Sequence, residues 1–266
     1  MMFTLIIGAS MGIGEAIARE FAGRGHNLVL VARSAEKLRA LAQQLRQEWG
    51  IAVEVCVEDL SDAESPARVY EFCRRQELMV DVLVNSAGLS YAGDFHDLPL
   101  GKLQEIMMVN MMAMAWLTRL FLSDMVERKK GIIINVASLG GLQGVPGLGL
   151  YSATKSFVLT LTEALYVELK GKGIKVFAVC PGFVDTGFLG RAGHNAANIR
   201  LPISGLDVVV KAVIKGLKKN RIRIFPTLID TALAFSQRAV SRKTTIRLAG
   251  FFAAVKDDYT KLSFFF

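Results

Sequence analysis

Three side chains in the middle of the chain have the types and the spacing for proton transfer. Tyr151 and Lys155 stand four residues apart in a segment of helical periodicity, which places the phenol and the ammonium on one helix face. A neighbouring ammonium favours the phenolate, so we expect the pKa of Tyr151 to fall from its usual value of about 10. Ser138, which closes a predicted buried strand, can hold a carbonyl oxygen beside the phenol. The three residues predict acid–base chemistry on a carbonyl or an alcohol.

Asn110 is a fourth polar candidate, within a long apolar segment that is predicted to be helical. Methionine and valine surround it in the sequence, so we expect its amide to be buried. Two interpretations stay open. The amide bonds to a neighbouring carbonyl and has a structural role, or it holds a water molecule that relays protons between Lys155 and solvent.

A glycine-rich turn follows the first predicted strand and opens the first predicted helix. It reads Gly8-Ala9-Ser10-Met11-Gly12-Ile13-Gly14. Glycines let the backbone approach a pyrophosphate, whose charge is met by free N–H groups and by the positive end of the helix dipole. The spacing G-x-x-x-G-x-G differs from the more common G-x-G-x-x-G. Alone, the turn predicts either a dinucleotide site or a plain tight turn.

The end of the second predicted strand indicates which dinucleotide would bind. An acidic residue about 20 residues beyond the glycines would bind a ribose 2′-hydroxyl, but here Ala32 is followed by Arg33 and Ser34. A guanidinium fork and a hydroxyl suit a 2′-phosphate, which favours NADP over NAD. The alternative is a surface arginine at a strand end.

Three more turns follow predicted strands and are ordinary turns when taken alone. They are Asp59-Leu60, Asn85-Ser86-Ala87-Gly88 and Pro181-Gly182-Phe183-Val184-Asp185-Thr186. In the last of these, the Thr186 hydroxyl is suited to bond a nicotinamide carboxamide.

Hydrophobic periodicity predicts the scaffold that carries these turns. Short runs rich in Val, Ile and Leu alternate with longer helical stretches, which is typical of a doubly wound α/β fold with a parallel sheet. Seven strands are predicted over 3–8, 27–32, 51–57, 81–84, 131–137, 174–180 and 222–225. Helices are predicted over 12–24, 34–48, 62–76, 100–127, 152–171 and 206–219. The segment 187–204 is either a mobile loop or two short helices.

Composition excludes several classes of protein. The 266 residues are 52% hydrophobic and 21% charged with 6 prolines, which excludes disordered, collagen-like and disulfide-scaffold proteins. The three cysteines and three histidines lack ligand spacing, so we expect reduced thiols and no metal site. Neither a secretory signal nor an uncharged apolar run of 18 residues is present, so we expect a cytoplasmic protein.

The excess positive charge lies at the carboxyl end. Of 32 basic and 24 acidic residues, 12 basic and 4 acidic ones come after residue 200. Beyond Pro226, basic residues alternate with large apolar ones up to Lys261 and Phe264-Phe265-Phe266. Three interpretations stay open: helices that cover a substrate pocket, an amphipathic membrane-surface anchor, or a site for phosphate-bearing substrates such as acyl-CoA. Nucleic-acid binding is not expected, because no motif of that kind accompanies the charge.

In their order and joint spacing, these motifs resemble a single-domain short-chain dehydrogenase/reductase over roughly residues 3–225. The resemblance implies a Rossmann-type sheet, hydride transfer with NAD(P), and a catalytic tetrad of Asn110, Ser138, Tyr151 and Lys155. It also implies cofactor contacts at Gly8, Ser10, Gly12, Ile13, Gly14, Arg33, Ser34, Asp59, Leu60, Asn85, Ala87, Gly88, Tyr151, Lys155, Pro181, Gly182, Val184 and Thr186. Residues 1–225 then form the catalytic domain, and 226–266 are an extension of it or a surface helix. Ile7 and Ser86 depart mildly from the family pattern.

The predicted function is hydride transfer between NADP(H) and a carbonyl or secondary alcohol, with a hydrophobic ketone or a 3-oxoacyl chain as substrate. The alternative is a non-catalytic NADP-binding regulator or scaffold. Five methionines cluster on the long predicted helix, and core packing is favoured for them over a subunit interface. They are Met107, Met108, Met111, Met112 and Met114. Since relatives often pair through this helix and the one that bears Tyr151, a homodimer or homotetramer is expected.

Overall fold

Seven parallel strands form one sheet in the order β3-β2-β1-β4-β5-β6-β7. A computed structural model describes residues 2–256 of the chain. The strands are β1 Met2–Ile7, β2 Asn27–Ala32, β3 Val53–Val57, β4 Met79–Asn85, β5 Gly131–Val136, β6 Ile174–Val179 and β7 Arg223–Ile224. The predicted doubly wound Rossmann-type fold is confirmed. The strand order reverses between β1 and β4, and a crevice at the carboxyl ends of such strands is where this architecture binds ligands.

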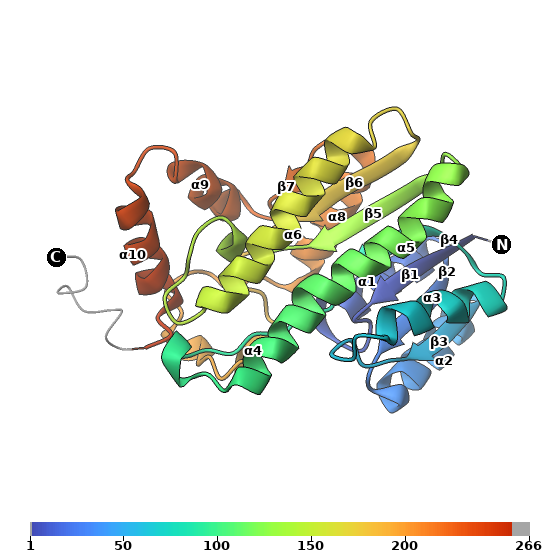
Figure 1. Ribbon diagram of the computed structural model, residues 1–266, viewed down its shortest axis with the longest axis horizontal. Coiled ribbons are helices and arrows are strands. Elements are labelled where there is room, and N and C mark those ends of the chain that lie inside the picture. The colour runs from blue at the N-terminus through green and yellow to red at the C-terminus, as the bar shows by residue number, and fades with distance from the viewer. Residues whose placement is uncertain (1, 257–266) are drawn as a thin grey trace.

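Helices cover both faces of the sheet (Figure 1). On one face, α1 Gly12–Gly23, α2 Ala35–Trp49 and α8 Leu206–Lys218 pack against the strands through Phe21, Leu41 and Val213. On the other, α3 Ser65–Arg75, α5 Met114–Glu127 and α6 Gly149–Glu168 do so through Cys73 and Phe121, among others. Because both faces are buried, the strands are apolar nearly throughout, as the sequence pattern predicts.

The long helix predicted over 100–127 is interrupted. It consists of α4 Leu100–Met107, a π-helical segment Met108–Ala113 and α5, and Asn110 lies in the π-helical segment. Such segments occur frequently at functional sites. The 28 residues are long and apolar enough to cross a membrane, with a mean hydropathy of 1.4 over an 18-residue window. Core helices pass the same test, and α5 packs against β4 and α3.

The carboxyl-terminal part folds beside the carboxyl ends of the strands (Figure 1). The segment 187–204 contains α7 Phe188–Arg191 and a 3-10 turn Ala196–Asn198, so the alternative of two short helices is correct. Two helices follow β7: α9 Leu228–Ser236 and α10 Arg242–Ala253. A backbone hydrogen bond of 3.0 Å from Arg200 N to Phe252 O joins α10 to the segment 187–204. Lys261 and Phe264–Phe266 lie outside the described residues.

Candidate active site

A cavity of about 510 Å³ opens at the carboxyl ends of the strands. Its wall includes the glycine turn after β1, the turns after β2 to β6, the first turns of α6, and parts of α7, α9 and α10. Of the eighteen predicted cofactor contacts, all but Asn85 lie in this wall. The fold therefore brings motifs from six separate turns to one place.

The glycine turn can cradle a phosphate group because side chains would not fit there. A Cβ on Gly14 would lie 2.1 Å from Gly8 O, and a Cβ on Gly8 would lie 2.7 Å from the backbone of Ala87. Gly8 also has a φ of 84°, which favours glycine. Met11 stands at the N-cap position of α1, and a thioether is a poor cap. The first N–H groups of α1 therefore stay available to an anion.

Arg33 lies at the cavity wall after β2 with a side chain that is 61% exposed. Its Nη1 is 3.7 Å from Asp59 Oδ2 and 3.6 Å from Glu105 Oε1. Ser34 occupies the N-cap position of α2, and Lys37 follows one helical turn later in the same wall. Sequence reasoning missed Lys37, although its spacing of three residues from Ser34 on a predicted helix was a usable signal. This part of the wall therefore offers two cations and a hydroxyl.

The side chain of Asn85 has a structural role. Its amide Nδ2 donates to Thr118 Oγ1 at 3.1 Å and to Asn135 Oδ1 at 2.9 Å, deep between β4, β5 and α5. The side chain is buried, and its hydrogen bonds tie the layers together. The side chain of this last residue of β4 points into the core, and the residues after it border the cavity. The predicted cofactor contact of Asn85 stays a prediction.

Asn110 makes the structural hydrogen bonds that one of the two interpretations expected. Its Oδ1 accepts from Leu89 N at 2.9 Å, and its Nδ2 donates to Leu89 O at 2.9 Å and Thr154 Oγ1 at 3.0 Å. It thus fixes the turn after β4 against α6. A Cβ on Gly88 would lie 3.3 Å from Lys155 Nζ and 3.6 Å from Asn110 Oδ1, so Gly88 keeps the space between them open.

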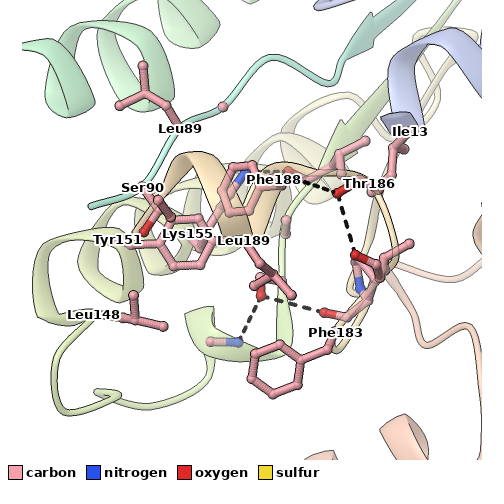
Figure 2. A pocket seen from close by; sticks show the side chains of 18 of the residues that line it. Ile13, Leu89, Ser90, Leu148, Tyr151, Lys155, Phe183, Thr186, Phe188 and Leu189 are labelled. Atoms are coloured by element: carbon pink, nitrogen blue, oxygen red, sulfur yellow. Dashed lines mark hydrogen bonds between the residues drawn. The ribbon is translucent and has the colours of Figure 1, made fainter. Parts of the chain in front are cut away.

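Ser138 and Tyr151 come together in the cavity wall. Ser138 follows β5, is 9% exposed, and its Oγ accepts from Gly140 N at 3.1 Å. Burial raises the pKa of Tyr151, and a hydrogen bond with Ser138 opposes that rise. The ring of Phe188 lies 5.8 Å from the ring of Tyr151, centroid to centroid. Figure 2 shows Phe188 and Leu189 beside this tyrosine.

Contrary to our prediction, Lys155 does not lower the pKa of Tyr151. Its Nζ lies 5.8 Å from the centroid of the Tyr151 ring and donates to Val136 O at 2.8 Å. The lysine is itself buried, which lowers its pKa to about 8. Desolvation by burial is the largest cause of both pKa shifts. The phenol is therefore held in its protonated form at neutral pH.

The turn after β6 closes the wall between the glycine turn and Tyr151. A Cβ on Gly12 would lie 3.1 Å from Thr186 Cβ, so the two turns are in close contact. Thr186 Oγ1 accepts from Phe188 N at 3.3 Å and donates to Val184 O at 3.4 Å (Figure 2). The predicted contact between Thr186 and a carboxamide stays a prediction.

Much of the rest of the wall is apolar and was not placed by sequence reasoning. Leu148 and Phe183 contribute from the turns after β5 and β6. The carboxyl-terminal helices and the loop between them add Leu233, Val240, Leu248, Ala249 and Phe252. Of the three interpretations of this tail, the structure supports helices that cover a pocket. Alternation of apolar and basic residues predicted helices here, but their place over the cavity depends on tertiary packing.

Comparison with known proteins identifies the family. The sequence profile described as short chain dehydrogenase matches residues 3–197. The chain belongs to the short-chain dehydrogenase/reductase family. A very-long-chain 3-oxoacyl-CoA reductase from Anas platyrhynchos is 38% identical over 190 residues, which are 69% of this chain and 60% of that protein. The chain thus covers less than two thirds of that reductase.

Two further relatives match a larger share of this chain than the reductase from Anas platyrhynchos does. The ketoacyl reductase HetN from Nostoc sp. is 35% identical over 215 residues, covering 79% of this chain and 74% of HetN. The solved structure of a short-chain dehydrogenase from Sphingobium yanoikuyae in complex with NADPH has a TM-score of 0.82 and 34% identity. That match covers 90% of this chain and 93% of the other.

Proposed function

We propose that this short-chain dehydrogenase/reductase reduces the ketone of a hydrophobic substrate with NADPH. One observation carries the proposal: Ser138, Tyr151 and Lys155 line the same cavity as the glycine turn and an apolar wall. The relatives are named as reductases and dehydrogenases, which does not favour the alternative of a non-catalytic regulator. The complex of the Sphingobium protein with NADPH supports the choice of cofactor.

The residues present fit a dinucleotide. The cradle of Gly8 and Gly14 and the N-terminus of α1 suit a pyrophosphate, while Arg33, Ser34 and Lys37 suit a 2′-phosphate. Gly88 leaves room beside Lys155 for a ribose hydroxyl. When bound, NADPH supplies the hydride that reduces the carbonyl carbon. The remaining chemistry belongs to the chain.

Tyr151 is the proton donor in this mechanism. Burial keeps the phenol protonated at neutral pH, which prepares it to give its proton to the carbonyl oxygen as negative charge develops there. Ser138 Oγ, which bonds with Tyr151, donates to the same oxygen and stabilises the charge. Lys155, with a pKa of about 8, is mostly cationic at neutral pH and stabilises the phenolate left after transfer. Asn110 holds the turn beside Lys155.

The apolar wall selects the substrate class. Phe183, Phe188 and Leu148, together with side chains of α9 and α10, surround the space next to Tyr151. Burial of such side chains against a ligand is worth roughly 1.5–3 kcal/mol each at most. A bulky ketone or a 3-oxoacyl chain gains from this wall, whereas a short polar ketone does not. The carbonyl-reducing activity is tested by NADPH oxidation with ketones of increasing apolar size and with a 3-oxoacyl thioester. Tight NADPH binding without turnover of any carbonyl would favour the regulator.

We also propose that the protein is a homo-oligomer that pairs through α4 and α5. The prediction that the methionines of this helix pack in the core is only partly correct, because Met114 is buried but Met107 is 40% and Met112 37% exposed. Trp116 on the same helix is 40% exposed. Exposed apolar side chains that cluster on one helix are typical of an interface. Light scattering at micromolar concentration tests this proposal.

Cytoplasmic localisation and contact of the basic tail with an acyl carrier or a membrane stay predictions. Val240 and Leu248, exposed by 42% and 37%, form an apolar rim of the cavity on α10 and the loop before it. The exposed cations Arg238, Arg242 and Lys243 lie close to them in the sequence. Such a rim suits an amphipathic substrate with a negatively charged end.

A further inference from the structure

A buried carboxylate lies behind the turn that follows β6. Asp230, in the first turn of α9, is 7% exposed. Its Oδ2 accepts from Thr227 N at 3.1 Å, and its own N–H donates to Thr227 Oγ1 at 2.9 Å, which completes a capping box. The carboxylate also lies against the backbone of Gly182, whose N–H lowers the pKa of Asp230. A helix cap needs only the two bonds with Thr227.

The approach of Asp230 to Gly182 depends on the absence of a side chain there. A Cβ on Gly182 would lie 2.6 Å from Asp230 Oδ1, which is closer than real Cβ contacts allow. Burial raises the pKa of Asp230, and the bonds from Thr227 and Gly182 oppose that rise. The carboxylate is therefore kept in the interior by specific partners, and one of them, Gly182, lies in the cavity wall.

The carbonyl end of the Pro181–Gly182 peptide contacts Ser138. The carbonyl of Pro181 accepts from Leu139 N at 2.9 Å and from Ser138 Oγ at 3.5 Å. That carbonyl and the N–H of Gly182 belong to one planar peptide unit, so they cannot turn independently. Asp230 holds one end of this unit, and Ser138 contacts the other.

We infer that Asp230 is a positioning residue for Ser138, acting through the Pro181–Gly182 peptide. The inference rests on the proposed function of Ser138. A negative charge at the N–H end polarises the peptide and strengthens its carbonyl as an acceptor. The carbonyl then fixes the rotamer of Ser138, from which its single hydroxyl proton can turn to Tyr151 or to a substrate oxygen. Through this peptide, α9 is linked to the reacting groups.

Three variants separate positioning from helix capping. Thr227→Val removes the hydroxyl that caps α9 but leaves the carboxylate on Gly182. Asp230→Ala removes both the cap and the contact with Gly182, and Asp230→Asn keeps one acceptor oxygen in place. All three are expected to lower the thermal midpoint, since each removes or weakens the cap of α9. Thr227→Val therefore controls for the loss of stability in the Asp230 variants.

We expect kcat to fall in the variants that lose the contact between Asp230 and Gly182, and not in the variant that loses only the cap of α9. Thr227→Val keeps the wild-type kcat, Asp230→Ala lowers it about 10- to 100-fold, as misplacement of a reacting group does, and Asp230→Asn falls between. NADPH affinity, measured by fluorescence, falls by a smaller factor than kcat, because the displaced Pro181–Gly182 peptide is only one of several predicted cofactor contacts. In alcohol oxidation the rate rises with pH as Tyr151 loses its proton. In Asp230→Ala this rise occurs at higher pH, because the Ser138 bond that lowers the pKa of Tyr151 is misaligned.

Equal kcat and equal pH profiles for Asp230→Ala and Thr227→Val would overturn the inference. A crystal structure of Asp230→Ala provides a readout without turnover, and we expect the Pro181–Gly182 peptide and the Ser138 hydroxyl to be displaced. An unchanged peptide and hydroxyl would also overturn the inference. If wild-type protein turns over no carbonyl while this displacement is seen, the proposed function fails and the positioning contact stands.

Discussion

Replacing Arg33 by alanine tests how the protein chooses between the two nicotinamide dinucleotides. The guanidinium lies 3.6–3.7 Å from Asp59 and Glu105, and its side chain is 61% exposed, so those ion pairs are weak. A 2′-phosphate therefore does not have to break a strong interaction in order to bind Arg33. Hydrogen bonds to charged groups contribute roughly 1.5–3 kcal/mol. Because this site is screened by water, we expect the lower half of that range.

Every 1.4 kcal/mol corresponds to about a tenfold change in affinity, so Arg33→Ala should raise the Kd for NADPH about 10- to 40-fold and leave the Kd for NADH unchanged. Fluorescence titration of both cofactors at two salt concentrations measures the effect and its electrostatic origin. Arg39→Ala removes the same charge from an exposed position of α2 outside the cavity wall and serves as the matched control. Equal losses for NADPH and NADH, or equal effects of the two variants, would refute the reasoning.

Three further predictions follow from the contacts in the cavity wall. Asn110→Ala should lower the free energy of unfolding by about 2–4 kcal/mol in urea titrations. It removes three hydrogen bonds and leaves the N–H and the carbonyl of Leu89 without their side-chain partner. A loss below 1 kcal/mol would contradict the structural role. Lys155 has a pKa of about 8 in the folded protein and of 10.5 in the unfolded chain. Between these pH values the unfolded state binds more protons, so the free energy of unfolding of the wild-type protein should rise by up to about 3 kcal/mol from pH 8 to 10.5. Lys155→Met should lack that rise, and identical curves would count against the buried lysine. Phe188→Ala should raise the KM for a bulky ketone about tenfold without changing NADPH affinity, because Phe188 packs beside Tyr151. Phe235 is 52% exposed, so Phe235→Ala should leave the KM unchanged. Similar effects of the two variants on the KM would contradict the assigned wall.

Much of the scaffold could be predicted because parallel strands buried on both faces are apolar throughout. The strand predicted over 27–32 has these bounds in the structure, and β7 is shorter than predicted by one residue at each end. The π-helical interruption at Met108–Ala113 could not be predicted, because apolar residues on every side of that helix conceal a local change of period. It arises where Asn110 bonds to the turn after β4.

The site was predictable where local turn chemistry decides it. The glycine turn, Ser138 and the pair of Tyr151 and Lys155 are each specified by short spacings. The pKa of Tyr151 was predicted in the wrong direction, since spacing on a helix does not reveal desolvation or the preference of Lys155 for the Val136 carbonyl. Contacts such as that between Asp230 and Gly182 join segments 48 residues apart and are visible only in the folded chain.

Single-turnover reduction by the Tyr151→Phe variant tests the central claim, that a buried phenol beside Ser138 donates the proton in carbonyl reduction. Wild-type and variant protein, both saturated with NADPH, are mixed with a bulky apolar ketone, and the decay of NADPH absorbance is followed. General acid catalysis contributes about 10²- to 10⁴-fold, so we predict a rate lower by that factor with unchanged NADPH affinity. A variant that reduces the ketone as fast as the wild-type protein would contradict the account.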